Sequence, residues 1–307
     1  MSAIATVTVP GTTANLGPGF DCIGAALTLY NQFQFRLSPD LSDRVEIAVR
    51  GEEAARVNTD EDNLVYRAFA QFYQHLGQTP PNVAIEIELG VPLARGLGSS
   101  ATAIVGGLVG ANQLAGNLLS STEVMELAIA LEGHPDNVVP ALLGGCQLSI
   151  RAENRWKICS LRWHSRLIPI VAIPDFELST EQARSVLPEE TPRSDAVFNI
   201  ARMGLLVGSL ESPHSDGLRV ALDDRLHQPY RQGLIRGYDR VREAAIAAGA
   251  YGMVISGAGP TLLALAELAF APKVAAAMEE AWQIEGIGVE VRSLTLDPDG
   301  ARVETQQ

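Results

Sequence analysis

One stretch of this 307-residue sequence decides how its fold is interpreted: Pro92-Leu93-Ala94-Arg95-Gly96-Leu97-Gly98-Ser99-Ser100-Ala101-Thr102. It is a glycine-rich turn, and the small apolar residues that follow as far as Leu114 predict a buried helix. Glycine lets the backbone approach a ligand closely, and the first N–H groups of a helix have no partner inside it. Because the helix dipole is positive at that end, the stretch predicts a site for an anion, with phosphate the expected one.

Two known phosphate-binding patterns compete for this loop. A Walker A loop is excluded, because no G-K-[ST] follows the glycines. Gly96 to Ala101 does fit the dinucleotide pattern G-x-G-x-x-[GA], after a predicted strand over Val83–Leu89. However, that pattern needs a tight turn and a strand ending in an acid about 20 residues onward, where Ser120–Glu123 instead predicts the start of a helix. A nucleotide phosphate is favoured, and an NAD(P)-dependent oxidoreductase is the alternative.

Composition limits the class of protein. The chain is 47% hydrophobic and 19% charged, which suits a globular protein with a large core, and its formal net charge of −13 disfavours nucleic acid and anionic membranes as partners. No apolar segment reaches the roughly 18–20 residues that a membrane span needs. We expect no signal peptide, because the first residues lack a charged region followed by an apolar stretch. Cys22, Cys146 and Cys159 are odd in number and lack metal spacing, which predicts buried thiols in a reducing compartment. We therefore expect a cytoplasmic protein.

The hydrophobic pattern predicts an α+β protein in two domains. Strands are expected at Ala5–Val9, Thr28–Leu37, Arg44–Val49 and Val83–Leu89, a helix at Asn63–Leu76 and a hairpin at Cys146–Ile150 and Trp156–Trp163. The second half predicts strands at Leu167–Ile173, Gly252–Ile255, Thr261–Leu265 and Val289–Leu296, with helices that include Tyr238–Ala248 and Val274–Ile284. Charge rises near 151–166, so we predict domains at 1–163 and 164–307, the second with a ferredoxin-like βαββαβ order.

Two further glycine-rich segments flank the phosphate loop in the sequence. Thr12 to Asp21 places the short polar side chains Asn15 and Asp21 among glycines, where they could bind a ligand or serve only a turn between strands. Ser256 to Thr261 is either a hairpin turn or a second place where the backbone approaches a ligand.

Polar residues that could bind a ligand or take part in catalysis cluster in two more places. Glu132 lies next to His134, Asp136 and Asn137, and a carboxylate with serine hydroxyls and phosphate oxygens is the usual ligand set for Mg²⁺. The alternative is a solvated helix end.

Two arginines could form a clamp for a substrate carboxylate. Thr180 and Arg184 lie four residues apart on one helical face, and Arg231 follows Pro229-Tyr230. Paired guanidinium groups suit a carboxylate, although surface salt bridges are the commoner use of arginine.

Together these segments resemble the GHMP kinase family, and within it the homoserine kinases, over nearly the whole chain. The three family motifs are similar to Asn15–Asp21, Pro92–Ala101 and Ser256–Thr261. The narrower resemblance rests on Glu132-Gly133-His134-Pro135-Asp136-Asn137-Val138, on Leu178-Ser179-Thr180 with Ala183-Arg184, and on Pro229-Tyr230-Arg231.

The resemblance implies a two-domain fold and a reaction. The N-terminal domain would be like ribosomal protein S5 domain 2, with a left-handed βαβ crossover, and the C-terminal domain would be ferredoxin-like, with the active site between them. The implied reaction is ATP-dependent phosphorylation of the side-chain hydroxyl of L-homoserine, a step of threonine biosynthesis. A homodimer is left open.

The same resemblance assigns roles to residues of this chain. Pro92 to Thr102 would bind ATP, with Arg95 to Ser100 around its phosphates, and Ser100 and Glu132 would hold Mg²⁺, with Glu126 as the alternative carboxylate. The substrate residues would be Asn15, Asp21, His134, Asp136, Asn137, Thr180, Arg184, Arg231 and Gly257. Of these, Asp21 and Arg184 are the expected catalytic residues, and Arg184 and Arg231 would take the carboxylate. A non-catalytic sensor on the same fold is the second alternative, disfavoured because the expected ligands are all retained.

Overall fold

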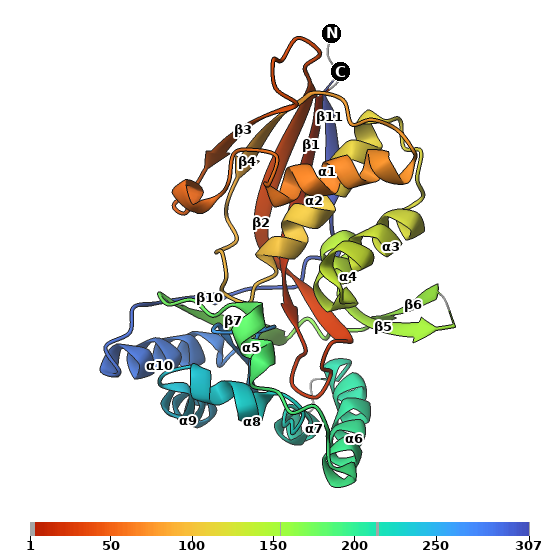
Figure 1. Ribbon diagram of the computed structural model, residues 1–307. Coiled ribbons are helices and arrows are strands. Elements are labelled where there is room, and N and C mark those ends of the chain that lie inside the picture. Colours follow the sequence, from red (N-terminus) through yellow and green to blue (C-terminus); the bar gives the residue numbers. More distant parts are fainter. Residues whose placement is uncertain (1–3, 154, 213–214, 307) are drawn as a thin grey trace.

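The chain forms two β-sheets with helices packed on them (Figure 1). The computed structural model describes residues 4–153, 155–212 and 215–306. The first sheet holds β1 (Ile4–Ala14), β2 (Ile23–Leu37), β3 (Val45–Arg50), β4 (Val83–Glu88), β5 (Cys146–Ala152), β6 (Arg155–Leu161) and β11 (Arg302–Gln306). The second holds β7 (Leu167–Pro174), β8 (Gly252–Ile255), β9 (Leu262–Glu267) and β10 (Val289–Ser293).

The helices follow the same division. α1 (Leu64–His75), α2 (Ser99–Leu114), α3 (Ser121–Glu132) and α4 (Pro135–Leu143) precede β5 in the chain. α5 (Thr180–Ser185), α6 (Arg193–Leu210), α7 (Ser215–Ala221), α8 (Gln228–Arg231), α9 (Tyr238–Ala248) and α10 (Ala271–Ile284) come after β7. In the described part of the chain, no helix combines the length and the apolar character that crossing a membrane requires.

The first sheet runs in the order β11-β1-β2-β4-β3, and β5 and β6 extend it from the beginning of β2. β3 and β4 are parallel, with Ile47 opposite Ile85, so the chain must cross over between them. α1 makes that crossover, and the side chain of Asn63 caps it by accepting hydrogen bonds from the backbone N–H groups of Val65 and Tyr66.

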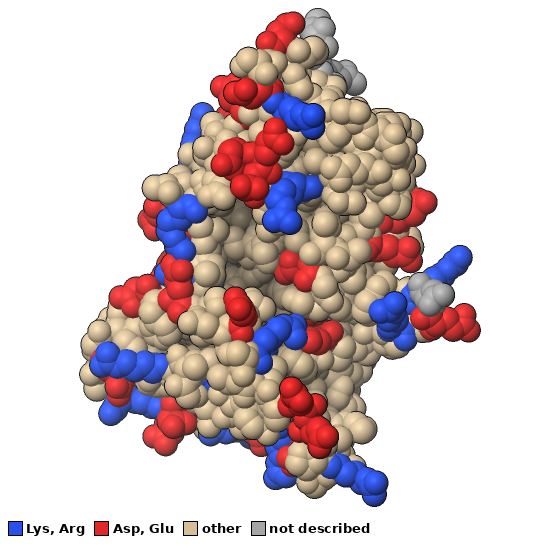
Figure 2. All heavy atoms as spheres, in the orientation of Figure 1, with Lys and Arg blue, Asp and Glu red and all other residues tan. Residues whose placement is uncertain are grey.

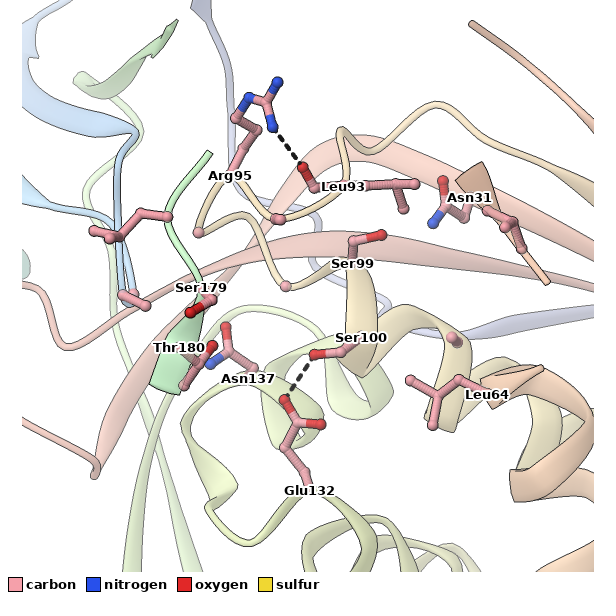
Figure 3. Close-up of a pocket in the computed structure, with 18 of the residues that line it drawn as sticks. Asn31, Leu64, Leu93, Arg95, Ser99, Ser100, Glu132, Asn137, Ser179 and Thr180 are labelled. Carbon is pink, nitrogen blue, oxygen red and sulfur yellow. Dashed lines mark hydrogen bonds between the residues drawn. The ribbon is translucent and has the colours of Figure 1, made fainter. Parts of the chain in front are cut away.

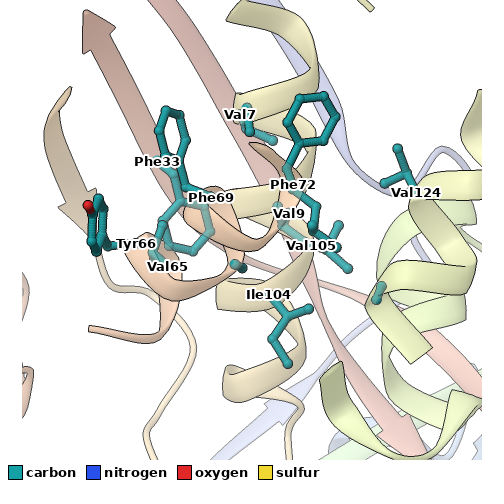
Figure 4. Packing of buried hydrophobic residues seen from close by; sticks show 14 of the residues in the cluster. Val7, Val9, Phe33, Val65, Tyr66, Phe69, Phe72, Ile104, Val105 and Val124 are labelled. Carbon is teal, nitrogen blue, oxygen red and sulfur yellow. The ribbon is translucent and has the colours of Figure 1, made fainter. Parts of the chain in front are cut away.

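α2 is buried because its glycines let neighbouring groups approach its axis. A Cβ at Gly106 would lie 2.4 Å from the ring of Phe33, one at Gly107 would lie 2.3 Å from the carbonyl oxygen of Val65, and one at Gly110 would lie 2.3 Å from the Phe35 ring. Figure 4 shows the resulting core, in which Phe33, Phe69 and Phe72 lie close to Val7, Val9, Ile104 and Val105. The small apolar residues of the helix thus position the phosphate loop that precedes it.

The second sheet has the order β10-β7-β9-β8, and each neighbouring pair is antiparallel. In chain order this is 4-1-3-2, the ferredoxin-like arrangement that the sequence predicts. α9 and α10 cover one face of this sheet. We call each sheet with the helices packed on it a unit. The opposite face of the second sheet packs on the first unit through a shared apolar cluster that includes Leu27, Leu97, Val171 and Leu263. This shared core fixes the two units against each other at the place where the glycine-rich loops meet.

The end of the chain departs from the predicted elements. Val289–Leu296 was expected to be the last strand, but β10 ends at Ser293 and residues 302–306 return to the first sheet as β11, antiparallel to β1. This strand was missed because the sequence Arg302-Val303-Glu304-Thr305-Gln306 is polar and short, as edge strands are. The predicted division into 1–163 and 164–307 stays a prediction, and it does not include this return.

Two smaller expectations also need correction. β1 extends to Ala14, so the first glycine-rich segment begins within a strand, and only residues 15–22 form its turn. Of the three cysteines, which are all free thiols, Cys146 is buried as expected, but Cys22 is half-buried and Cys159 is exposed.

Asp297 holds the returning chain in place. Its carboxylate accepts hydrogen bonds from the Tyr30 hydroxyl (2.9 Å) and Arg302 Nη1 (2.6 Å) and from the backbone N–H groups of Asp299 and Gly300. Burial alone would raise the pKa of this carboxyl, but these hydrogen bonds outweigh it and lower the pKa below its ordinary value. The ionised carboxylate therefore stabilises the fold.

We expect Asp297→Asn to lower the free energy of unfolding at pH 7 by about 1.5–3 kcal/mol, since a hydrogen-bonded charge is lost. Because the pKa is lower in the folded state, the stabilisation is complete above the ordinary value and is lost as pH falls through the folded value. The difference in free energy of unfolding between Asp297→Asn and the unsubstituted protein should therefore become smaller below about pH 4. Urea unfolding at several pH values measures it. Asp299→Asn, at an exposed neighbour, is the control, and an equal loss there would contradict this role.

Candidate active site

A cavity of about 560 Å³ lies where the two units meet. It is lined by residues of the turn between β1 and β2, of β2, α1 and β4, of the loop before α2, of the α3–α4 junction, of α5 and α8, and of the loop after β8. Figure 2 shows this face of the molecule hollowed near its centre. The three glycine-rich segments singled out in the sequence therefore converge on one site.

The phosphate loop is held by the other two glycine-rich segments. Gly96 and Gly98 have φ values of 71° and 69°, which favour glycine. A Cβ on Gly96 would lie 2.3 Å from the carbonyl oxygen of Ser256, and one on Gly98 would lie 2.0 Å from Oγ1 of Thr12. The Ser256 hydroxyl also donates a 2.7 Å hydrogen bond to the carbonyl oxygen of Gly96. The loop thus owes its shape to close contacts with Ser256 and Thr12 that a side chain on either glycine would block.

The predicted ATP-binding stretch divides between the cavity and the core. Its cavity-lining members are Leu93, Ala94, Arg95, Gly96, Gly98, Ser99 and Ser100. Pro92 does not line the cavity, and Leu97, Ala101 and Thr102 are at most 1% exposed. Leu97 packs in the core shared by the two units, and Thr102 accepts a hydrogen bond from Asn31. Binding of ATP by Pro92 to Thr102 stays a prediction, and the side chains of Leu97, Ala101 and Thr102 are buried away from the cavity.

Arg95 anchors the loop to the second unit. Its Nε donates to the carbonyl oxygen of Pro174, Nη1 to that of Leu93 and Nη2 to that of Asp175 (Figure 3 shows the bond to Leu93). Backbone carbonyls thus already engage the three guanidinium nitrogens of Arg95.

Ser100 and Glu132 come together at the beginning of α2 and the end of α3. The Ser100 hydroxyl donates a 2.9 Å hydrogen bond to Oε1 of Glu132 (Figure 3). Burial raises the pKa of Glu132 above its ordinary value, against the effect of the Ser100 hydrogen bond. The alternative carboxylate, Glu126, is exposed on α3 and does not line the cavity.

The first turn of α4 presents the cluster of His134, Asp136 and Asn137. Nδ1 of His134 lies 2.5 Å from Oδ1 of Asp136, and Asn137 Oδ1 accepts a 2.8 Å hydrogen bond from Thr12. Burial lowers the pKa of His134, but the hydrogen bond to Asp136 and the charges of Asp136 and Glu132 outweigh it and raise the pKa. The His134–Asp136 pair is therefore an ion pair when the imidazole is protonated.

Asp21 and Arg184 form a bidentate pair across the cavity, with Nη2–Oδ1 and Nη1–Oδ2 distances of 2.8 and 3.0 Å. Asp21 has a φ of 56° and Asn15 one of 72°, conformations uncommon outside glycine. The turn is held by Asn15, whose Oδ1 accepts from the backbone N–H of Asp21 and whose Nδ2 donates to the carbonyl oxygen of Gly257. Thr180 and Arg231 line the same end of the cavity.

The apolar end of the cavity was not predicted. It is lined by Phe33, Leu64, Val65, Ile87 and Leu89, with the polar residues Asn58, Asp62 and Asn63 near the start of α1. These residues come from β2, β4 and the beginning of α1, and their alternation in the sequence indicated only a core. No local motif distinguishes a residue that lines a cavity from one packed in the interior.

The sheet topology argues against the dinucleotide alternative. β4 precedes the glycine loop, but it pairs antiparallel with β2 and parallel only with β3. A dinucleotide fingerprint belongs to an open, mostly parallel sheet, which is not the sheet observed.

Comparisons with known proteins agree with this geometry. The family model for the GHMP kinases N terminal domain matches residues 63–145, and that for the GHMP kinases C terminal matches residues 206–284. Homoserine kinase of Crocosphaera subtropica is 63% identical over 97% of each chain, and that of Trichormus variabilis is 64% identical over 98% of this chain and 100% of its own.

Solved structures extend the agreement to three dimensions. The crystal structure of homoserine kinase from Cytophaga hutchinsonii has a TM-score of 0.89 and 32% identity, covering 98% of this chain and 97% of its own. Mevalonate kinase of L. major, at 15% identity over 95% of each chain, shares the fold with a TM-score of 0.71. This chain belongs to the GHMP kinase family and, within it, to the homoserine kinases.

Proposed function

We propose that this enzyme transfers the γ-phosphoryl group of ATP to the side-chain hydroxyl of L-homoserine, giving O-phospho-L-homoserine. One observation supports it above the others: a single cavity holds a glycine-rich loop at a helix N-terminus and, beyond it, a carboxylate paired with an arginine. The loop suits phosphates, and the charged pair suits an amino acid.

ATP would lie along the length of the cavity. Its phosphates would meet the backbone N–H groups at the start of α2 and the hydroxyls of Ser99 and Ser100. Its base would occupy the apolar end, between the side chains of Leu64, Val65 and Leu89. In this arrangement the γ-phosphate would point towards Asp21 and Arg184.

Ser100 and Glu132 fit a magnesium ion in the chemistry of their donors. They supply a hydroxyl and a carboxylate 2.9 Å apart, and the described residues contain no group of three His, Cys, Asp or Glu that could hold a metal by themselves. Mg²⁺ characteristically takes one or two carboxylate ligands and completes its shell with phosphates and water. When bound, it would neutralise charge on the phosphate oxygens.

The substrate would be held by its charged groups. Its carboxylate would bind Arg184 and Arg231, as charge-assisted hydrogen bonds favour. In this structure Arg184 pairs with Asp21, so a carboxylate that takes Arg184 releases Asp21 to accept a hydrogen bond from the reacting hydroxyl. A loose transition state leaves that hydroxyl protonated until late, so Asp21 needs only to orient it.

The decisive experiment is ³¹P NMR of the purified protein with Mg-ATP and L-homoserine. O-phosphohomoserine should form, whereas mevalonate and galactose should give no product. If one of these other alcohols gives product, the assignment of the nucleotide site stands and the assignment of the substrate residues is rejected. ATP binding without any product would favour the sensor alternative. The cytoplasmic location and the homodimer stay predictions from the sequence.

Asp21→Asn should lower kcat by about 10- to 1000-fold, because an amide orients the hydroxyl less well and cannot take its proton. Steady-state kinetics with homoserine measure this, with circular dichroism to verify folding. Asp43→Asn, at an exposed loop position, is the control. An unchanged kcat in folded Asp21→Asn would reject the role.

Glu132→Gln should raise the Mg²⁺ concentration needed for half-maximal activity at least about tenfold, which corresponds to about 1.4 kcal/mol. The amide keeps the size of the side chain and an acceptor for Ser100, but loses the charge that attracts the metal. Activity as a function of free Mg²⁺ at fixed ATP measures it. Glu126→Gln on the same helix is the matched control, and a larger effect there would assign the metal to Glu126.

Arg184→Leu should raise the KM for homoserine about 10- to 100-fold, because one charge-assisted contact with the carboxylate is lost. It should affect 3-aminopropan-1-ol, which is homoserine without the carboxylate, much less. The ratio of kcat/KM values for the two alcohols is the readout. If the ratio is unchanged, Arg184 does not bind the carboxylate.

A further inference from the structure

Arg231 is one of the largest fully buried side chains of the protein, at 2% exposure. A buried guanidinium group requires acceptors, because its desolvation is otherwise costly. Three acceptors are present: the carbonyl oxygen of Ala183 for Nε (2.9 Å), and the carbonyl oxygen of Gly257 (3.2 Å) and Nδ1 of His227 (3.3 Å) for Nη1. Among the described residues, none forms a hydrogen bond with Nη2, and Arg231 lines the cavity.

The two bonds of the His227 ring define its tautomer. Nε2 lies 2.9 Å from the carbonyl oxygen of Gly17, which can only accept, so Nε2 carries the proton. Nδ1 faces Nη1 of Arg231, which can only donate, so Nδ1 presents its lone pair. A doubly protonated ring would set donor against donor, and burial, together with the charge of Arg231, favours the neutral form against the opposing charge of Asp224 by lowering the pKa of His227.

The ring is also fixed in orientation. Its face stacks on Phe20, with centroids 5.1 Å apart, and Phe20 lies 5.2 Å from the guanidinium carbon of Arg231. Its backbone is fixed by Asp224, whose carboxylate accepts hydrogen bonds from the N–H groups of His227 and Gln228 at 2.9 and 2.7 Å. His227 is wholly buried and does not line the cavity, so it acts through Arg231 and the turn around Gly17.

We propose that His227 is a positioning residue for the substrate carboxylate: its Nδ1 lone pair holds Nη1 of Arg231, so that Nη2 is presented to the cavity. Its Nε2–H group ties the same ring to the turn that carries Asp21. One neutral imidazole thus sets the spacing between the carboxylate-binding arginine and the residue that orients the hydroxyl. The inference deepens the proposed function and rests on it.

Two substitutions separate the two bonds of the ring. The amide oxygen of an asparagine can take the place of Nδ1 as acceptor for Arg231, whereas the amide nitrogen of a glutamine can take the place of Nε2 as donor to Gly17. His227→Gln should therefore raise the KM for homoserine about tenfold more than His227→Asn does. Both variants lose the stacking on Phe20, so a merely structural role would affect the two alike.

The controls distinguish this inference from the proposed function. His75→Gln, at an exposed position near the end of α1, controls for the substitution type, and the KM for ATP should change less than about twofold in both His227 variants. Arg231→Lys should itself raise the KM for homoserine, and no rise there would reject the proposed clamp. A rise there with equal KM values for His227→Gln and His227→Asn, or a parallel rise in the KM for ATP, would reject the role of His227 alone.

A measurement on the unsubstituted protein avoids any failure of a variant to fold. In ¹⁵N NMR of the histidine rings, the His227 resonances should show a proton on Nε2 and none on Nδ1, and the Nδ1 resonance should shift when homoserine is added. A proton on Nδ1, or an Nδ1 resonance that homoserine leaves unmoved, would overturn the inference.

Discussion

The close approach of neighbouring groups to Gly96 and Gly98 is the contact on which the site depends. At these positions the phosphate loop touches Thr12 of the first unit and Ser256 of the second, at distances that leave no room for a Cβ. The loop is therefore shaped by both units together. The apolar cluster that includes Leu27, Leu97 and Val171 fixes the two units against each other. Packing in this core therefore also determines the geometry of the site.

The sequence predicted the parts of the site that carry a local signal. Glycine-rich turns, helix caps and charged residues at helix ends are readable one segment at a time, and Asn15, Glu132 and Arg184 were found in this way. The helix start predicted at Ser120–Glu123 is confirmed, and it is a capping box. Only the family resemblance predicted that these segments meet, because no periodicity in the sequence places Gly257 beside Asn15, 242 residues away.

The remaining features depend on tertiary contacts and could not be predicted. Val65 and Ile87 line a cavity but occupy positions typical of core residues. β11 is recognisable only from its pairing with β1, because its own pattern is polar. Nothing in the sequence distinguished His227, a single histidine two residues before Pro229. Only the fold brings Gly17 and Arg231 to its two ring nitrogens.

The pairing of Asp21 with Arg184 has a consequence for water. A kinase must keep its γ-phosphate from hydrolysis, and water is smaller than any alcohol substrate. Water carries no carboxylate and so cannot take Arg184 from Asp21. In the proposed mechanism, Asp21 would therefore stay paired with Arg184 until a substrate with a carboxylate binds. Binding of the substrate carboxylate would thereby free the residue that orients the hydroxyl, and ATP would be protected from hydrolysis until then.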